Sequence, residues 1–211
     1  MSAASATTAA ILASIRNAHR SDEPYRHYLL SDMLPPEDVK ILREMDVPVP
    51  KDFVFEGKRE NNNGRRLFAN KATRALHPVF DRMCESFDSA EVRQALTDSL
   101  GAKLDGNRLR IEFALDTEGF WLEPHTDVGA KKMTLLIYLN DADQDMGTDI
   151  YNSALAHQGR APAPPNSGLF FVPGSDTFHG FERRAFKELR RTVIINFVGP
   201  EWRNTDELAL G

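Results

Sequence analysis

Cysteine is almost absent from this sequence, which has a single one, Cys84, among its 211 residues. One cysteine cannot form an internal disulfide, so the fold must rely on its core, and a reducing, cytoplasmic location is expected. Positive charge is also scarce, because 26 lysines and arginines stand against 31 aspartates and glutamates, giving a net charge of −5. Domains that bind nucleic acid usually carry a basic face, so nucleic acid is not expected as a partner.

Long apolar runs are missing as well. The longest one near the start, residues 9–15, is too short to span a bilayer, and Arg16 follows it where a secretory cleavage site would stand. We therefore expect no membrane association and no secretion. The Ala/Ser-rich start has no acidic residue before Asp22, which leaves two interpretations open, an organellar transit peptide and an amphipathic packing helix.

The composition that is present is typical of an ordinary globular domain. Hydrophobic residues make up 41% of the chain and charged residues 27%, and 211 residues suit a single domain. Helix caps and apolar residues at helical spacing dominate the first half, whereas short runs of β-branched and aromatic residues dominate the second. We predict one α+β domain, in which residues 1–23 form a helix or flexible extension, 24–106 mainly helical support, 107–200 a β-strand core and 201–211 a tail.

A His-Thr-Asp sequence between two expected strands carries the first chemical signal. Residues i and i+2 of a strand point to the same face, so His125 and Asp127 can offer an imidazole and a carboxylate to one point. The pair alone is common, and a polar turn would explain it equally well. His179, after a later strand and turn, adds a third donor. Two histidines and one carboxylate form the facial triad that binds Fe(II) and leaves coordination positions open.

The remaining histidines show no comparable grouping. We interpret them as exposed or structural residues, not ligands: His19, His27, His77 and His157.

An arginine at the head of the last expected strand suggests an anionic ligand. Strand alternation sets Arg190, Thr192 and Asn196 on one face and Arg191 on the other. If the first face lines a barrel, a guanidinium inside it requires an anionic partner, which a dicarboxylate could supply through a bidentate pair. A register slip of one residue would exchange the two arginines, so Arg191 stays open as the alternative to the favoured Arg190.

The order of these motifs resembles that of the iron(II)- and 2-oxoglutarate-dependent dioxygenases, within them the prolyl-4-hydroxylase-like branch. The stretch "RIEFALDTEGFWLEPHTDVGAKKMTLLIYLND" carries the strand, the motif and the following strand, and "EPYRHYLLSDMLPPEDV" resembles the branch's N-terminal entry. The likeness covers about residues 24–200. It implies a double-stranded β-helix, a jelly-roll, cupin-like barrel with N-terminal supporting helices. "MGTDIYN" stands where the family often has Gly-Gly-Glu, which leaves local substrate contacts in doubt.

The resemblance also implies a reaction and its residues. It assigns the catalytic iron ligands to His125, Asp127 and His179, and 2-oxoglutarate binding to Arg190, Tyr138 and Thr192. Fe(II), 2-oxoglutarate as cosubstrate and O2 would then hydroxylate an unactivated C–H bond, with decarboxylation of 2-oxoglutarate to succinate. Asp127 favours hydroxylation over halogenation, since a halogenating relative leaves that ligand position vacant for chloride.

The substrate and the oligomeric state stay open. A small molecule and a protein or peptide side chain are both considered, as are a monomer and a homodimer. Aromatic and polar residues near the expected barrel mouth could contact substrate, although aromatic residues beside strands are more often core: Trp121, Glu123, Tyr151 and Asn196. The alternative function is a cupin-like metalloprotein of another reaction type, or a non-catalytic sensor that binds 2-oxoglutarate or metal.

Overall fold

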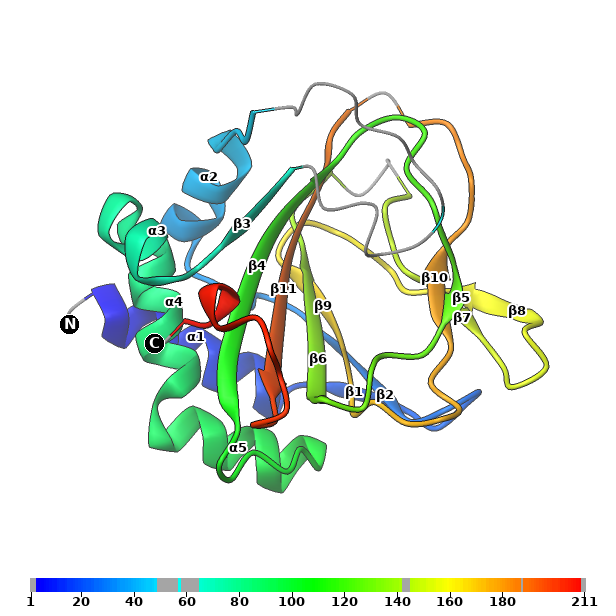
Figure 1. The fold of residues 1–211 in the computed structure, drawn as a ribbon, viewed down its shortest axis with the longest axis horizontal. Helices are drawn as coiled ribbons and strands as arrows, with labels where there is room; N and C mark the ends of the chain where they lie inside the picture. The colour runs from blue at the N-terminus through cyan, green and yellow to red at the C-terminus, as the bar shows by residue number, and fades with distance from the viewer. Residues whose placement is uncertain (1–2, 49–56, 58–64, 142–144, 187, 210–211) are drawn as a thin grey trace.

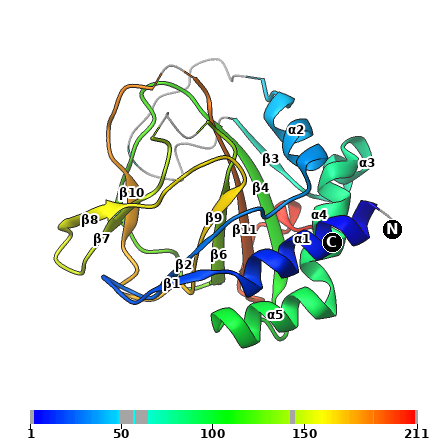
Figure 2. The same cartoon turned by 180° about the vertical axis from the view of Figure 1, so that it is seen from behind.

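Two antiparallel sheets enclose the interior of the molecule, and helices cover the outer face of the larger sheet (Figures 1 and 2). This arrangement comes from a computed structural model, which describes residues 3–48, 57, 65–141, 145–186 and 188–209. The larger sheet has the strand order β1-β2-β9-β6-β11-β4-β3, and the smaller has the order β5-β10-β7-β8. The predicted α+β double-stranded β-helix is therefore confirmed.

The strands of the two sheets come mostly from the second half of the chain. The larger sheet consists of β1 (His19–Ser21), β2 (His27–Leu30), β3 (Arg66–Phe68), β4 (Arg108–Asp116), β6 (Lys131–Tyr138), β9 (Ser167–Phe171) and β11 (Arg190–Val198). The smaller sheet consists of β5 (Leu122–His125), β7 (Asp149–Tyr151), β8 (His157–Arg160) and β10 (His179–Phe181). Three of these strands precede residue 107, so the predicted helical support also extends the larger sheet at both edges.

The helices are short. They are α1 (Ala3–Arg16), α2 (Pro36–Glu44), α3 (Lys71–Leu76), α4 (Pro78–Asp88) and α5 (Ala90–Leu100), with the 3-10 turn η3 (Thr205–Glu207) near the end. In α3 and α5 the residue before the helix caps the first turn with its side chain. In α5 the Ser89 side chain accepts from the amide of Val92, and Gly101 ends the helix with a φ of 79°. Among the described residues, none of the helices has the length and apolar character needed to cross a bilayer.

Alternation along β4, β6 and β11 separates a packing face from a polar face. On β11, Val193, Ile195 and Phe197 belong to the core shared with the helices. The intervening residues Ile194 and Asn196 point to the space between the sheets, where Ile194 joins a smaller apolar cluster. Because β11 is paired with both β4 and β6, all three strands present the same polar face to this space. That face positions the candidate site.

Candidate metal and cosubstrate site

A cavity of about 460 Å³ lies between the two sheets. Strands β4, β5, β6, β10 and β11 contribute to its walls, together with residues that follow β5 and residues near the C-terminus. The structure brings to it five of the residues singled out from the sequence: Glu123, His125, Asp127, His179 and Arg190.

Two histidines on neighbouring strands form the centre of the site. His125 and His179 are register partners across β5 and β10, and their ring centroids lie 4.5 Å apart. In each ring Nδ1 contacts the carbonyl oxygen two residues earlier, that of Glu123 at 2.8 Å and that of Thr177 at 3.0 Å. A carbonyl oxygen can only accept, so Nδ1 carries the proton and Nε2 keeps its lone pair. This tautomer suits metal binding through Nε2.

The environment of His179 keeps its ring neutral. The pKa of His179 is lowered to about 4, mainly by burial; the charge of Asp127 acts in the opposite direction, and the nearby His125 adds to the lowering. At neutral pH the ring is therefore uncharged, and its lone pair does not have to lose a proton before it binds a metal.

The Asp127 carboxylate is held at both oxygens. Its side chain is 4% exposed; Oδ1 accepts from Lys131 Nζ at 2.5 Å, and Oδ2 accepts from Thr134 Oγ1 at 2.6 Å. Burial raises the pKa of Asp127, but the charge of Lys131 and the hydrogen bonds from Lys131 and Thr134 outweigh it and hold the pKa well below its usual range. Asp127 is thus ionised, as a metal ligand must be, and the Lys131 ammonium competes for one of its oxygens.

The buried guanidinium of Arg190 already has an anionic partner in the chain. Its Nη1 donates to Asp116 Oδ2 at 2.8 Å, and its Nε donates to the carbonyl of Met146 at 2.9 Å. Asp116 therefore supplies the neutralising charge that the sequence argument had assigned to a dicarboxylate. A guanidinium carries five N–H donors, of which these contacts use two, so donors are left for a ligand carboxylate.

The register places the two candidate arginines on opposite faces. Arg190 pairs with Asp116 across β11 and β4 and lines the cavity. Arg191 is outside the cavity lining; burial lowers its pKa, and Asp46 and Arg65 are among the charges that act on it. The geometry thus favours Arg190 as the cation available to a ligand in the cavity.

The other two predicted cosubstrate residues lie beside Arg190 but outside the cavity lining. Tyr138 donates from its hydroxyl to Thr148 Oγ1 at 2.8 Å, and Thr148 itself lines the cavity. Thr192 is the register partner of Tyr138, is fully buried, and its hydroxyl has no hydrogen-bond partner among the described residues. A buried hydroxyl without a partner costs about 1–3 kcal/mol. A carboxylate bound near Arg190 is the kind of group that would satisfy it.

Of the four candidate substrate residues, the structure places only Glu123 at the cavity. The Trp121 ring packs over Gly57, where an added Cβ would lie 2.2 Å from the ring, and Arg183 stacks on it at 4.5 Å. Tyr151 is buried with its ring 5.4 Å from that of His157. Asn196 is fully buried in a hydrogen-bond network within the larger sheet.

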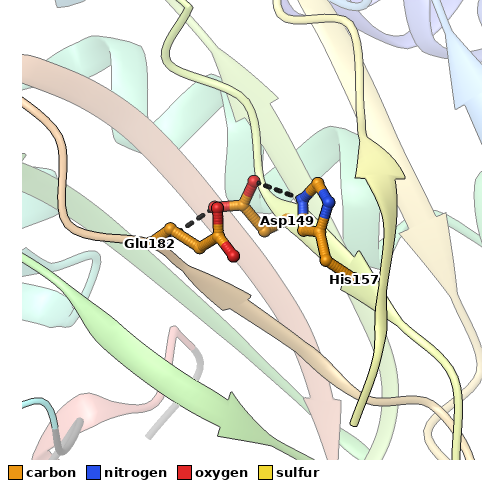
Figure 3. Close-up of side chains that lie close together, drawn as sticks. All are labelled: Asp149, His157 and Glu182. Atoms are coloured by element: carbon orange, nitrogen blue, oxygen red, sulfur yellow. Dashed lines mark hydrogen bonds and ion pairs between the residues drawn. The ribbon is translucent and has the colours of Figure 1, made fainter.

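A second cluster of potential ligands lies on the smaller sheet. Asp149, His157 and Glu182 form the group of three, within the described part of the chain, whose candidate ligand atoms all lie within 4.8 Å of one another (Figure 3). His125, Asp127 and His179 are spread more widely, with Asp127 held by Lys131 and Thr134. The structure thus offers two candidate metal positions, which differ in their electrostatics.

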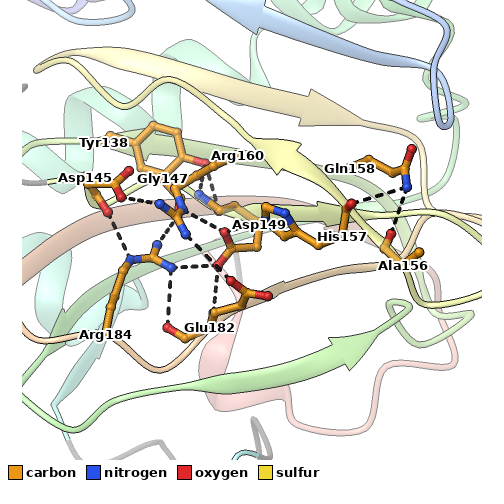
Figure 4. Close-up of polar contacts among 11 residues, drawn as sticks. Tyr138, Asp145, Gly147, Asp149, Ala156, His157, Gln158, Arg160, Glu182 and Arg184 are labelled. Atoms are coloured by element: carbon orange, nitrogen blue, oxygen red, sulfur yellow. Dashed lines mark hydrogen bonds and ion pairs between the residues drawn. The ribbon is translucent and has the colours of Figure 1, made fainter.

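Two arginines already surround the carboxylate of the second cluster (Figure 4). Arg160 Nε donates to Asp149 Oδ1 and Arg184 Nη1 donates to Oδ2, each at 2.7 Å. Burial raises the pKa of Asp149, but the bonds from Arg184, the Glu182 amide and His157 hold it below the usual value. A cation bound here would face two guanidinium groups. We therefore interpret this cluster as an ion-pair network that joins β7, β8 and the residues after β10.

Sequence reasoning missed Lys131 and Thr134, the two side chains that hold Asp127, and the ion pairs beside the predicted site. Lys131 stands four residues after Asp127, and Thr134 shares a strand face with Tyr138, so spacing could have found both. A series of ion pairs of alternating charge along β4 could not be predicted without the register of the strands, because its members come from distant segments. The pairs are Arg190 with Asp116, Asp116 with Arg66, Arg66 with Glu112, Glu112 with Arg110, and Arg110 with Glu207.

Comparison with known proteins gives matches in structure alone. Neither a family model nor a curated protein matches the sequence. Among solved structures, a prolyl 4-hydroxylase from Phytophthora capsici aligns with a TM-score of 0.61 and 15% identity, over 95% of this chain and 67% of that chain. A Pseudomonas putida prolyl-4-hydroxylase aligns with a TM-score of 0.59 and 16% identity, over 91% and 99%.

A third structure was solved with ligands bound. HygX from Streptomyces hygroscopicus, with nickel and 2-oxoglutarate bound, aligns with a TM-score of 0.53 and 14% identity, over 84% of each chain. At these identities the likeness concerns the fold. The chain has the fold of the solved prolyl-4-hydroxylases, as the resemblance in its motifs implied.

Proposed function

We propose that this protein is an Fe(II)- and 2-oxoglutarate-dependent oxygenase that hydroxylates an unactivated C–H bond. The observation that carries the proposal is the pair of facing histidines. His125 and His179 each donate Nδ1–H to a backbone carbonyl, which leaves both Nε2 lone pairs available beside the buried carboxylate of Asp127. This donor set is the two-histidine, one-carboxylate set suited to Fe(II).

The groups in the cavity, and the two hydroxyls beside it, have roles that follow from their chemistry. His125, His179 and Asp127 would hold Fe(II), and Arg190 would pair with the far carboxylate of 2-oxoglutarate, aided by the hydroxyls of Tyr138 and Thr192. When bound, Fe(II), 2-oxoglutarate and O2 supply the oxidising chemistry, with succinate as the coproduct. The protein orients the ligands, and apolar walls that include Leu136, Phe181 and Ile194 limit access of water.

The cavity favours a small substrate. About 460 Å³ has to hold the cosubstrate together with the part of the substrate that is oxidised. This volume lies within the range of small-molecule pockets, about 300–1,000 Å³. A small molecule, or one side chain of a peptide that lies across the entrance, would fit this space, and Glu123, which lines the cavity, would contact it.

An anaerobic titration tests the proposal. Purified protein mixed with Fe(II) and 2-oxoglutarate should develop a metal-to-ligand charge-transfer absorption band, and admitted oxygen should then release succinate. His179→Ala should abolish the band. His157→Ala is the matched control, since it removes a histidine from the other cluster. A band that persists in His179→Ala but is lost in His157→Ala would assign the metal to the second cluster, that of Asp149, His157 and Glu182. The absence of a band in the natural protein and in both variants would refute the oxygenase function.

One observation favours the alternative of a metalloprotein without 2-oxoglutarate. Arg190 is neutralised by Asp116 in this structure, so its burial does not by itself demand a dicarboxylate. In that case Fe(II) would bind with the same dependence on His179, while 2-oxoglutarate would leave both the spectrum and the metal affinity unchanged. The titration above separates the two functions, because metal binding and cosubstrate binding are measured in successive additions.

A further inference from the structure

A chain of hydrogen bonds runs through the interior of the larger sheet to the carboxylate of Asp127. Arg110 Nη1 donates to Asn196 Oδ1 at 3.2 Å, and Asn196 Nδ2 donates to Thr134 Oγ1 at 3.0 Å. The Thr134 hydroxyl reaches Asp127 Oδ2 at 2.6 Å. The members lie on β4, β11 and β6, whose pairing places Asn196 directly opposite both Arg110 and Thr134. The sheet register therefore builds this chain.

The chemistry of the four groups fixes the direction of every bond. A guanidinium only donates, so the Asn196 oxygen faces Arg110 and its amide nitrogen faces Thr134. Asn196 Nδ2 also donates to the carbonyl of Met133 at 3.2 Å. Since Thr134 Oγ1 already accepts from Asn196, its one hydrogen is directed to the ionised Asp127, which can only accept. If the Thr134 hydroxyl turned its hydrogen elsewhere, its bond to Asp127 would be lost.

This directionality has a consequence for the metal site. The bond from Thr134 holds Asp127 Oδ2 in place. The other oxygen, Oδ1, contacts Lys131, and it is the oxygen that can exchange this ammonium for a metal ion. Thr134 is 3% exposed and Asn196 is fully buried, so water has little access to these bonds. Arg110, at the far end, lines the same cavity and is paired with Glu112 and Glu207. One network thus reaches from the cavity wall to the carboxylate.

We propose that Thr134 and Asn196 are positioning residues that hold Asp127 in the orientation in which it binds the metal. The inference rests on the proposed function, because it takes Asp127 as a metal ligand. Hydrogen-bond partners of metal ligands commonly contribute about 10–100-fold to metal affinity. Neither residue touches the metal in this assignment, since both act through the orientation of one carboxylate.

The test measures metal affinity and needs no turnover. Fe(II), or Mn(II) as a stable substitute, is titrated anaerobically into the metal-free protein without 2-oxoglutarate, and heat or protein fluorescence reports binding. Thr134→Val removes the hydroxyl with almost no change in shape and should weaken binding about 10–100-fold. Thr134→Ser keeps the donor and should restore affinity to within about threefold of the natural protein.

The chain offers a matched control in its helical layer. Thr7 is fully buried on α1 and donates to the buried carboxylate of Asp38 at 2.8 Å, which repeats the Thr134 to Asp127 contact away from the cavity. Thr7→Val should lower the melting temperature by an amount similar to Thr134→Val while leaving metal affinity unchanged. An equal loss of affinity in both variants would show a general loss of stability and would overturn the proposal.

The upstream residue is tested in the same titration. Asn196→Ala should weaken metal binding less than Thr134→Val, because the hydroxyl is retained but is free to turn away from Asp127. Natural affinity in Asn196→Ala would overturn the role of Asn196, and natural affinity in Thr134→Val would overturn the whole network. If the natural protein itself binds no metal, the proposed function fails first, so the two failures are distinguishable.

Discussion

At the scale of single residues, Lys131 is the group that we expect to oppose metal binding at the proposed site. Its ammonium contacts Asp127 Oδ1 at 2.5 Å, in a pair whose side chains are 17% and 4% exposed. A metal that binds this oxygen has to displace the ammonium or accept a second positive charge close to it. Either alternative costs free energy, because Coulomb interactions are strong where water is excluded.

Substitution of Lys131 by methionine should therefore tighten metal binding, about tenfold if the competing charge weakens it by about 1.4 kcal/mol. The same change should lower the melting temperature of the metal-free protein, since Asp127 loses its cation, and added metal should restore it. Lys132→Met is the control, because Lys132 pairs with the half-exposed Glu201 at the surface. Calorimetric titration and thermal unfolding measure both effects. Weaker metal binding in Lys131→Met would instead show that Lys131 assists the site.

At the scale of secondary-structure elements, the Asp149 network holds the smaller sheet together. Asp149 lies on β7, Arg160 on β8, and Arg184 and Glu182 follow β10, so one fully buried carboxylate joins three segments (Figure 4). Only short strands pair here, of three or four residues each. Since short strands contribute few backbone bonds, the side-chain network accounts for much of the order of this sheet.

Asp149→Asn should lower the free energy of unfolding by about 3 kcal/mol, because it breaks a buried ion pair. This value is at the lower end of such costs, since Arg160 and Arg184 keep some access to water. The pKa of Asp149 is lowered in the folded state, so its contribution is complete above the ordinary aspartate pKa and is lost as the pH falls through the folded value. The difference between the two proteins in urea unfolding should therefore shrink in acid.

The control for this prediction is an aspartate in an exposed ion pair. Asp141→Asn removes the partner of Arg43, in a pair whose side chains are 54% and 38% exposed. Such pairs contribute about 0–1 kcal/mol, so this variant should unfold close to the natural protein at every pH. A difference of the same size in both variants would contradict the structural role given to Asp149.

At the scale of the whole molecule, the sequence predicted those features that depend on local periodicity. Alternation on the last strand sufficed to place Arg190 and Arg191 on opposite faces, and the motif order sufficed for the class of fold. What could not be predicted depends on register between distant segments. Arg190 meets Asp116 because β11 pairs with β4 in one particular register, and no local pattern shows that pairing.

The same limit explains the substrate residues that the structure places elsewhere. Alternation along β11 places Asn196 on the strand face that lines the cavity. It lies opposite Arg110 and Thr134, however, and its side-chain oxygen and nitrogen form hydrogen bonds with them. Tyr151 is on a strand near the cavity, but its ring packs against His157. Alternation along a strand predicts which face a residue occupies, whereas the neighbours on that face decide whether its side chain reaches a ligand.

Ligand binding should stabilise the whole molecule in two separable steps. Each ligand at about a hundred times its Kd adds about 2.7 kcal/mol to the free energy of unfolding. For a chain of 211 residues that corresponds to about 5–11 °C in melting temperature. Metal should therefore raise the melting temperature once, and 2-oxoglutarate should raise it again only when metal is present, because in the proposed site the cosubstrate would bind both the metal and Arg190.

Arg190→Lys should keep the increase in melting temperature that metal causes and lose most of the further increase that 2-oxoglutarate causes. Lysine preserves the charge facing Asp116, so the fold and the metal ligands stay intact, but it lacks the planar fork that pairs with a carboxylate. Anaerobic thermal unfolding with Mn(II), with and without 2-oxoglutarate, measures both steps. Arg191→Lys is the control, since that side chain is outside the cavity lining and should leave both steps unchanged. A second step that is lost in Arg191→Lys and kept in Arg190→Lys would reverse the assignment of the two arginines.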